Sequence, residues 1–142
     1  MGARALILID THVLLWAMNE PERLGEEARR ILESASETDE IDISAISGWE
    51  IAMLADKERI RLKMPVRRWM ERAQSALRLR VIPIDMAIAI DAGSLPGDVH
   101  GDPGDRLLIA TARSLGCPLV TVDRAVLAYG RLGHVRVLDG RL

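Results

Sequence analysis

The sequence predicts an α/β fold in which helices cover both faces of a mainly parallel β-sheet. Short apolar runs alternate with amphipathic segments along the chain, and this alternation is typical of parallel sheets. Residues 102–115 begin with Asp-Pro, which suits a helix start, and they end before Gly116, which suits a helix stop. A β-branched run follows at residues 119–122. Right-handed crossovers place helices on both faces of such a sheet, which gives three layers, α/β/α.

The first half of the chain is expected to supply two strands. The apolar run at residues 5–9 is continuous, as expected of a strand buried on both faces, and Asp10 ends it. The second helix is amphipathic, with a clear apolar stripe. In order, we expect a strand at 5–9, a helix at 12–18, a helix at 25–36, a strand at 41–44 and a helix at 45–55.

The second half is expected to supply three more strands. Met64 and Pro65 begin a helix that runs to about residue 77, and a loop rich in Gly and Pro spans residues 93–101. In order, we expect a strand at 81–84, a helix at 85–92, a helix beginning at Asp102, a strand at 119–122, a helix at 124–129 and a last strand at 134–138.

Length and composition favour one domain, residues 1–142, with a sizeable core. The lone Cys117 excludes an internal disulfide and suits a reducing compartment, so we expect a cytoplasmic protein. The N-terminal apolar run is too short for a signal peptide or a membrane span, so no membrane association is expected.

The charge is unevenly distributed. Residues 57–80 contain nine basic and two acidic side chains, a sum of +7, whereas the whole chain carries −2, so the remainder carries −9. This basic segment is either an RNA-binding limb or a solvated helix face. The candidates for RNA binding are Arg59, Arg61, Arg67, Arg68 and Arg72.

Four acidic residues are expected to meet at the carboxyl-terminal edge of the sheet. Asp10 and Asp123 each follow a strand, Glu50 lies in an otherwise apolar helix after the second strand, and Asp105 lies in the first turn of a helix. Ligands of parallel sheets bind beyond this edge. The three aspartates also suit capping positions of helices, with Asp105 as the partner of Asp102 in a capping box.

Carboxylates gathered in this way indicate a divalent metal site. They would repel one another and raise their pKa values unless a cation lay among them. Oxygen ligands suit Mg²⁺ or Mn²⁺, and the lone cysteine and the spacing of the three histidines disfavour zinc. Such a cluster can activate water and stabilise charge on a phosphodiester.

Other hydrolase and phosphotransfer chemistries fit less well. The sequence contains neither GxxxxGK[ST] nor GxSxG. A dehalogenase-type phosphatase needs a second Asp where His12 stands, and a receiver domain needs a Lys after its last strand, whereas both lysines lie within residues 57–63.

Three stretches together resemble the PIN-domain ribonucleases, and most closely the VapC-type toxins of toxin–antitoxin pairs. They are LIDTHVLLWAMNEPERL, ISAISGWEIAML and HGDPGDRLLIATARSLGCPLVTVDRAV, which span nearly the whole chain. The shared features are an Asp after the first strand, a Trp-Glu-Ile in the helix after the second, an Asp-Pro-x-Asp-Arg and a Thr-x-Asp after the fourth.

The resemblance implies a five-stranded sheet ordered 3-2-1-4-5 and an endoribonuclease that depends on Mg²⁺ or Mn²⁺. It also implies homodimers and inhibition by a cognate antitoxin protein. The residues that it implies for catalysis and metal binding are Asp10, Glu50, Asp105 and Asp123. The residues that it places beside them are Thr11, Ser44, Asp102 and Thr121.

One departure from the family pattern is the pair of glycines, Gly101 and Gly104, where bulkier residues are common. We expect them to loosen the first turn of the helix without touching the acids. Two alternatives to the nuclease remain open from the sequence. One is a catalytically silent binding module of the same fold, and the other is a small-molecule phosphohydrolase.

Overall fold

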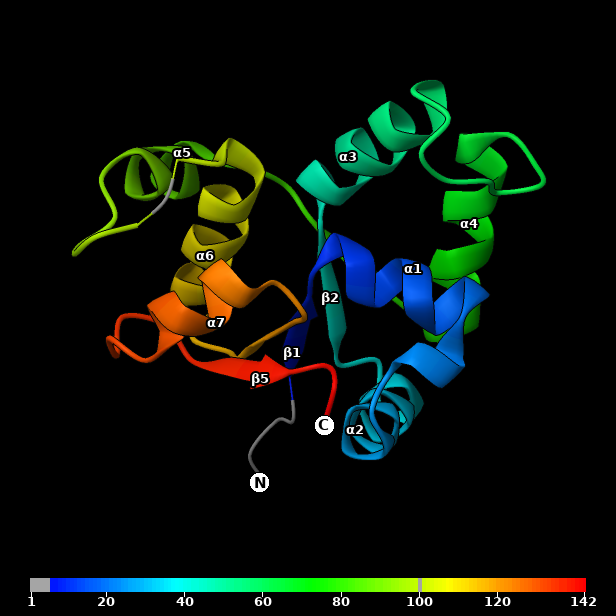
Figure 1. Ribbon diagram of the computed structural model, residues 1–142, viewed down its shortest axis with the longest axis horizontal. Helices are drawn as coiled ribbons and strands as arrows, with labels where there is room; N and C mark the ends of the chain where they lie inside the picture. Colours follow the sequence, from blue (N-terminus) through cyan, green and yellow to red (C-terminus); the bar gives the residue numbers. More distant parts are fainter. Residues whose placement is uncertain (1–5, 100) are drawn as a thin grey trace.

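The computed structural model describes residues 6–99 and 101–142, in which five strands form one parallel sheet ordered β3-β2-β1-β4-β5 (Figure 1). All four strand pairings are parallel, so the predicted fold class and strand order are confirmed. Ala5 and His100, which the predictions included, lie outside the described residues. The strands are β1 (Ile7–Ile9), β2 (Ile41–Ser44), β3 (Arg80–Ile82), β4 (Leu119–Thr121) and β5 (Val137–Asp139).

The helices follow the predicted order with small shifts at their ends. They are α1 (Thr11–Asn19), the 3₁₀ turn η1 (Pro21–Arg23), α2 (Glu26–Glu37), α3 (Ala45–Asp56), α4 (Val66–Leu77), α5 (Met86–Gly93), α6 (Pro103–Leu115) and α7 (Arg124–Gly130). Gly116 ends α6 in the left-handed conformation, at a φ of 65°, which a glycine adopts without steric cost.

Four predicted strands are shorter in the structure: β1 begins at Ile7, β4 ends at Thr121, and the ends of β3 and β5 also differ. β3 ends at Ile82 because Pro83 has no N–H to donate to a neighbouring strand. The last strand begins at Val137 rather than at residue 134. Residues 134 and 135 make contacts outside the sheet instead. The carbonyl of His134 accepts a hydrogen bond from Arg113 Nη1 at 2.8 Å, and Val135 is buried in the second core.

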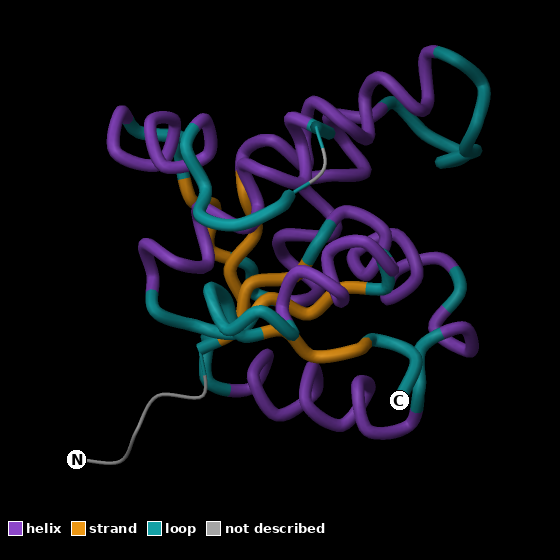
Figure 2. The backbone as a smooth tube through the Cα atoms, turned by 60° about the vertical axis from the view of Figure 1, so that its left-hand side comes forward, coloured by secondary structure: helices purple, strands orange, loops and turns teal. Residues whose placement is uncertain are grey.

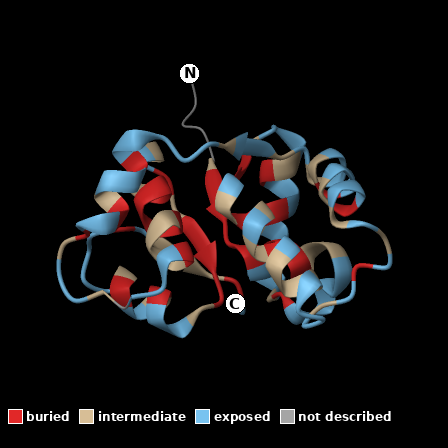
Figure 3. Cartoon of the chain, turned by 90° about the horizontal axis from the view of Figure 1, so that it is seen from above, coloured by how far each residue is buried: buried red, intermediate tan, exposed pale blue. Residues whose placement is uncertain are grey.

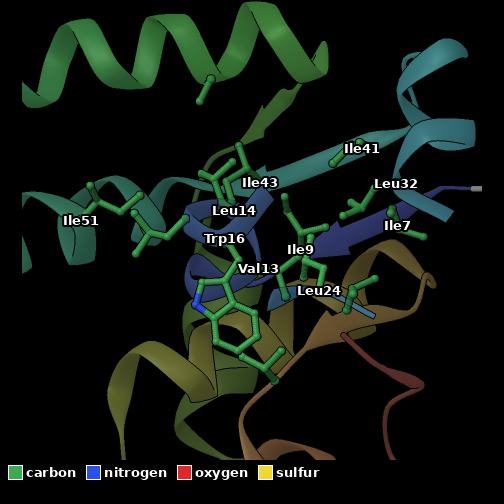
Figure 4. Packing of buried hydrophobic residues seen from close by; sticks show 14 of the residues in the cluster. Ile7, Ile9, Val13, Leu14, Trp16, Leu24, Leu32, Ile41, Ile43 and Ile51 are labelled. Carbon is green, nitrogen blue, oxygen red and sulfur yellow. The ribbon is translucent and has the colours of Figure 1, made fainter. Parts of the chain in front are cut away.

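Helices lie on both sides of the sheet (Figure 2), and the sheet separates two apolar cores. Alternate residues of β1 face opposite sides, so Ile7 and Ile9 join the core beneath α1, α2 and α4, whereas Leu8 joins the core beneath α5, α6 and α7. Figure 4 shows Ile7 and Ile9 among the labelled side chains of the first core. The buried positions concentrate along the strands and the inner faces of the helices (Figure 3).

The carboxyl ends of three strands lead directly into helices. Asp10, Ser44 and Asp123 are the N-caps of α1, α3 and α7, and each side chain accepts a backbone N–H of its own helix. Helix α3 packs against both α1 and α6. This arrangement brings the beginnings of four helices to one end of the sheet.

Two residues at the end of the basic segment have structural partners. Arg80 donates from Nε and Nη2 to both carboxylate oxygens of the fully buried Asp42, at 3.0 and 2.8 Å. Arg78 pairs with the exposed Asp39 at 2.7 Å. Neither contributes to a free basic limb. None of the helices in the described part of the chain combines the length and apolar character needed to cross a membrane.

Candidate active site

Asp10 occupies the centre of the acidic edge and is 5% exposed. Its Oδ1 accepts the backbone N–H of Val13 at 2.8 Å, which caps α1. Its Oδ2 accepts the hydroxyl of Thr121 and the backbone N–H of Val122, the latter at 3.4 Å. Burial raises the pKa of Asp10, although these hydrogen bonds oppose the increase. The predicted capping role is confirmed, and the same contacts hold the carboxylate in place.

Thr121 links two of the acidic residues. Its hydroxyl donates to Asp10 and also accepts the backbone N–H of Asp123 at 3.1 Å. Asp123 in turn caps α7 by accepting the N–H of Val126 at 3.0 Å. The buried Thr121 therefore fixes the end of β4 against the end of β1, and it positions both carboxylate-bearing residues.

Glu50 reaches the same edge from the second turn of α3. Its Oε1 accepts the hydroxyl of Thr11 at 2.8 Å, and Thr11 also shares a hydrogen bond of 2.9 Å with the buried hydroxyl of Ser47. The predicted neighbour Ser44 instead caps α3 by accepting the N–H of Ile46 at 3.1 Å. Ser47 is thus the hydroxyl that sequence reasoning missed. Its spacing of three residues from Glu50 places both on one face of the helix and could have revealed it.

The first turn of α6 completes the acidic edge. Oδ1 of Asp102 accepts the backbone N–H groups of Gly104 and Asp105, at 2.9 and 3.3 Å, which confirms its predicted capping role. A Cβ at the buried Gly104 would lie 3.1 Å from Oε2 of Glu50 and 3.3 Å from Oδ1 of Asp102. Gly104 therefore allows α6 to approach Glu50 closely. The expectation that it only loosens this turn is wrong.

The electrostatics show that the acidic residues are neighbours. Burial, and then the charges of Asp123, Asp102, Glu50 and Asp10 in decreasing order, raise the pKa of Asp105 to about 7. Burial and the charge of Asp102 also raise the pKa of Glu50, against the hydrogen bond from Thr11. The predicted residues of four separate elements are therefore brought together at one edge.

His12 is a second neighbour that the sequence did not indicate. It lies one residue beyond Thr11 on α1, and its charge acts to lower the pKa values of both Asp10 and Glu50. His12 is exposed and lines a groove together with other residues of α1.

The donor chemistry of this edge fits a hard divalent cation. All the donors are oxygens, and burial and mutual repulsion raise the pKa of Asp105, an effect that a bound cation would relieve. Within residues 6–99 and 101–142, no three His, Cys, Asp or Glu side chains surround a common point closely enough to hold an ion as they stand.

The residues proposed for RNA binding fall into two groups. Arg59 and Arg61 lie on the segment between α3 and α4 and line a groove that also contains His12. Arg67, Arg68 and Arg72 lie on exposed positions of α4 and do not line that groove. The structure therefore does not place the five arginines on one surface feature.

The chain has extensive similarity to known proteins. The PIN domain family profile matches residues 7–132. The chain is 42% identical over 123 residues to ribonuclease VapC22 of Mycobacterium tuberculosis, an alignment that covers 87% of this chain and 91% of the relative.

Solved structures share the fold at low sequence identity. VapBC2 from Rickettsia felis, bound to a promoter DNA fragment, matches with a TM-score of 0.70 and 19% identity over 94% of this chain and 97% of that one. A toxin–antitoxin complex from Klebsiella pneumoniae matches with a TM-score of 0.61 and 23% identity over the same shares. The strand order, the family profile and the VapC22 alignment agree, and the chain belongs to the PIN domain family.

Proposed function

We propose that this protein is a divalent-metal-dependent endoribonuclease that acts as the toxin of a toxin–antitoxin pair. The observation that carries the proposal is the convergence of Asp10, Glu50, Asp105 and Asp123, from four separate elements, at the carboxyl edge of the sheet. Similarity to a ribonuclease, VapC22, supports the same activity.

The oxygen donors suit Mg²⁺ or Mn²⁺. Asp10 and Asp105 are the proposed main ligands, Glu50 completes the coordination or orients water, and Asp123 holds a second, weaker ion. When bound, the cation supplies Lewis-acid stabilisation of phosphate charge and lowers the pKa of water. Without it, the raised pKa of Asp105 disfavours the fully charged cluster.

The hydroxyl groups of the chain position the carboxylates before any cation binds. Thr121 holds Oδ2 of Asp10, so that this carboxylate keeps one orientation. Thr11, supported by Ser47, holds Oε1 of Glu50 and leaves Oε2 directed toward Gly104. Such preorganisation limits the rearrangement needed to bind a cation and a phosphodiester.

Two protein partners belong to this proposal. An antitoxin is expected because a toxin–antitoxin complex shares the fold of this chain. Expression of the chain alone should then arrest bacterial growth, and co-expression of the cognate antitoxin should relieve the arrest. Growth that is unaffected by active, soluble protein would contradict the toxin role.

A homodimer is supported by helix α5, which is apolar on both sides. Ile88 and Ala92 are buried in the core, whereas Met86 and Ile90, one turn apart on the opposite face, are 74% and 63% exposed. A helix that is apolar all round is normally covered. Ile90→Glu should therefore shift the mass measured by light scattering from dimer to monomer, and an unchanged dimer would place the interface elsewhere.

The test of the activity is metal-dependent cleavage of RNA by the purified chain and its Asp10→Asn variant. Asparagine caps helices as well as aspartate, so the variant should keep its fold and its melting temperature. We expect cleavage with Mg²⁺ or Mn²⁺, none with EDTA, and a loss of at least about 100-fold in the variant. Undiminished cleavage by the variant contradicts the site. Turnover of a phosphomonoester without RNA cleavage would instead indicate a small-molecule phosphohydrolase.

A further inference from the structure

A groove of about 790 Å³ extends along α1, between this helix, the turn η1 and the segment that joins α3 to α4. Its lining includes His12 and Trp16 of α1, Arg23 of η1, and three cations of the joining segment, Arg59, Arg61 and Lys63. Glu20 is the one acidic side chain among the described residues that line it. The groove is therefore strongly basic, in contrast to the acidic edge of the sheet.

The three cations of the joining segment, hereafter the row of cations, lie at alternate positions of the sequence and line the same groove. Within residues 59–63, Leu62 is buried in the first core and Ile60 packs against it, whereas Arg59, Arg61 and Lys63 are exposed. The backbone N–H of Arg59 donates to the carbonyl of Leu54 at 2.9 Å, which ties the segment to the end of α3.

The row of cations is available for an external anion. Among the described residues, none of the three basic side chains has a carboxylate within ion-pair distance. Their buried neighbours fix the backbone, so the charges remain directed outward without an internal partner.

The groove starts at the proposed catalytic edge. His12, at its near end, is close enough to Asp10 and Glu50 for its charge to act on both carboxylates. From His12 the groove follows one face of α1 through Leu15 and Trp16 to Asn19, a rise of about 10 Å. A polyanion that leaves the acidic edge along α1 therefore meets the row of cations.

The far end of the groove is also held in place. The guanidinium of Arg23 stacks over the ring of Trp16, 4.2 Å from the ring centroid, and Nη1 pairs with Glu20 at 3.2 Å. Stacking on an indole fixes a guanidinium plane and leaves donors free for an anion.

We propose that this groove binds the sugar–phosphate backbone of single-stranded RNA on one side of the bond that is cut, with Arg59, Arg61 and Lys63 contacting successive phosphates. The inference rests on the proposed nuclease function and adds the path of the substrate. Arginine matches phosphate geometry through paired N–H donors, and a basic groove that follows the backbone is a usual way to bind a single strand. The exposed arginines of α4 have no part in this path.

The test compares two double variants that remove the same charge. Arg59→Gln/Arg61→Gln lies in the groove, and Arg67→Gln/Arg72→Gln lies outside it on α4. Each is made together with Asp10→Asn so that the RNA stays intact, and a short fluorescein-labelled oligouridylate is titrated by anisotropy at several salt concentrations.

We expect the groove variant to bind about 25-fold more weakly near 0.1 M salt, because each phosphate neutralised on a single strand contributes about 0.7 to the slope of log K against log salt. That slope should fall by about 1.4, because the variant no longer neutralises two of the phosphates. The α4 variant should stay within about two-fold of the parent. Equal losses in both variants, or no loss in either, would overturn the proposal.

Two further measurements distinguish the proposed RNA path from the nuclease function and from binding of an acidic protein segment. In the chain with Asp10 intact, the groove variant should raise KM for RNA cleavage and leave kcat unchanged. If RNA binds through the groove but the parent chain cleaves none, the nuclease function is refuted and the RNA-binding role of the groove stands. If a fluorescein-labelled oligoglutamate, and not RNA, loses affinity in the groove variant, the groove belongs to an acidic protein segment and the RNA assignment is wrong.

Discussion

At the scale of single residues, hydroxyl groups and one glycine determine how the acids are arranged. Thr121 serves two acidic residues at once, and Thr11 connects Glu50 to Ser47. The resemblance to the PIN-domain ribonucleases indicated both threonines. It indicated Ser44, and not Ser47, as the neighbouring serine. Ser47 lies within α3, and its contact with Thr11 depends on how α3 packs against α1, which the sequence does not specify.

Gly104→Ala should reduce metal-dependent cleavage about ten-fold without unfolding the protein. The added Cβ would lie 3.1 Å from Oε2 of Glu50, so this carboxylate must move by a few tenths of an ångström. Misplacement of a supporting group typically costs about 10- to 100-fold in metal affinity or activity. Alanine favours helix over glycine, so the melting temperature should not fall. Wild-type cleavage rates in this variant would show that close approach of α6 to Glu50 is unimportant.

Asp105→Asn should stabilise the metal-free protein at neutral and alkaline pH. Because the folded-state pKa of Asp105 is raised to about 7, its ionisation costs stability as the pH rises from about 4 to about 7, and the full cost is present above that range. The gain in the free energy of unfolding at about pH 8 should be about 1 kcal/mol, after allowance for solvent screening.

Chemical denaturation in EDTA at pH values on both sides of this range measures the effect. The variant and the parent should converge at about pH 3, where Asp105 is protonated in the folded chain and largely so in the unfolded chain. A loss of stability in the variant at pH 8 would mean that the capping interactions of this turn outweigh the repulsion.

At the scale of elements, apolar periodicity and capping residues were enough to predict the strands, the main helices and the edge at which the acids meet. The pairing of Asp42 with Arg80 was not predicted, since an acid within an apolar strand has no visible partner until β2 and β3 lie side by side. β3 ends at Ile82, before Pro83, because proline cannot donate a hydrogen bond to a neighbouring strand. The predicted strand 81–84 included this proline.

Arg80→Met should destabilise the protein by about 3 kcal/mol, because it leaves the fully buried carboxylate of Asp42 without its cation. Arg78→Met is the matched control, because its partner Asp39 is 62% exposed and can be solvated. The control should cost less than about 1 kcal/mol. Urea unfolding of the two variants compares them directly. Equal losses would indicate that Asp42 is solvated in the folded protein.

At the scale of the whole molecule, the candidate site lies where two separately packed halves meet. Asp10 belongs to the strand end beneath α1, on the side of the first core, whereas Asp105 belongs to α6, on the side of the second. A cation held by both would join the halves and favour the folded state by mass action. The sequence predicted this meeting of acids from their positions after strand ends and near helix starts. It did not predict that no three acidic, His or Cys side chains among the described residues form a ready ion site.

The most direct measurement of the central claim is Mn²⁺ binding, followed by electron paramagnetic resonance, in the parent chain and in Asp10→Asn. We expect saturable binding by the parent and binding at least about ten-fold weaker by the folded variant, because one carboxylate charge and ligand are removed. Equal Mn²⁺ affinity in the two proteins, or no binding by the folded parent, would contradict the metal site.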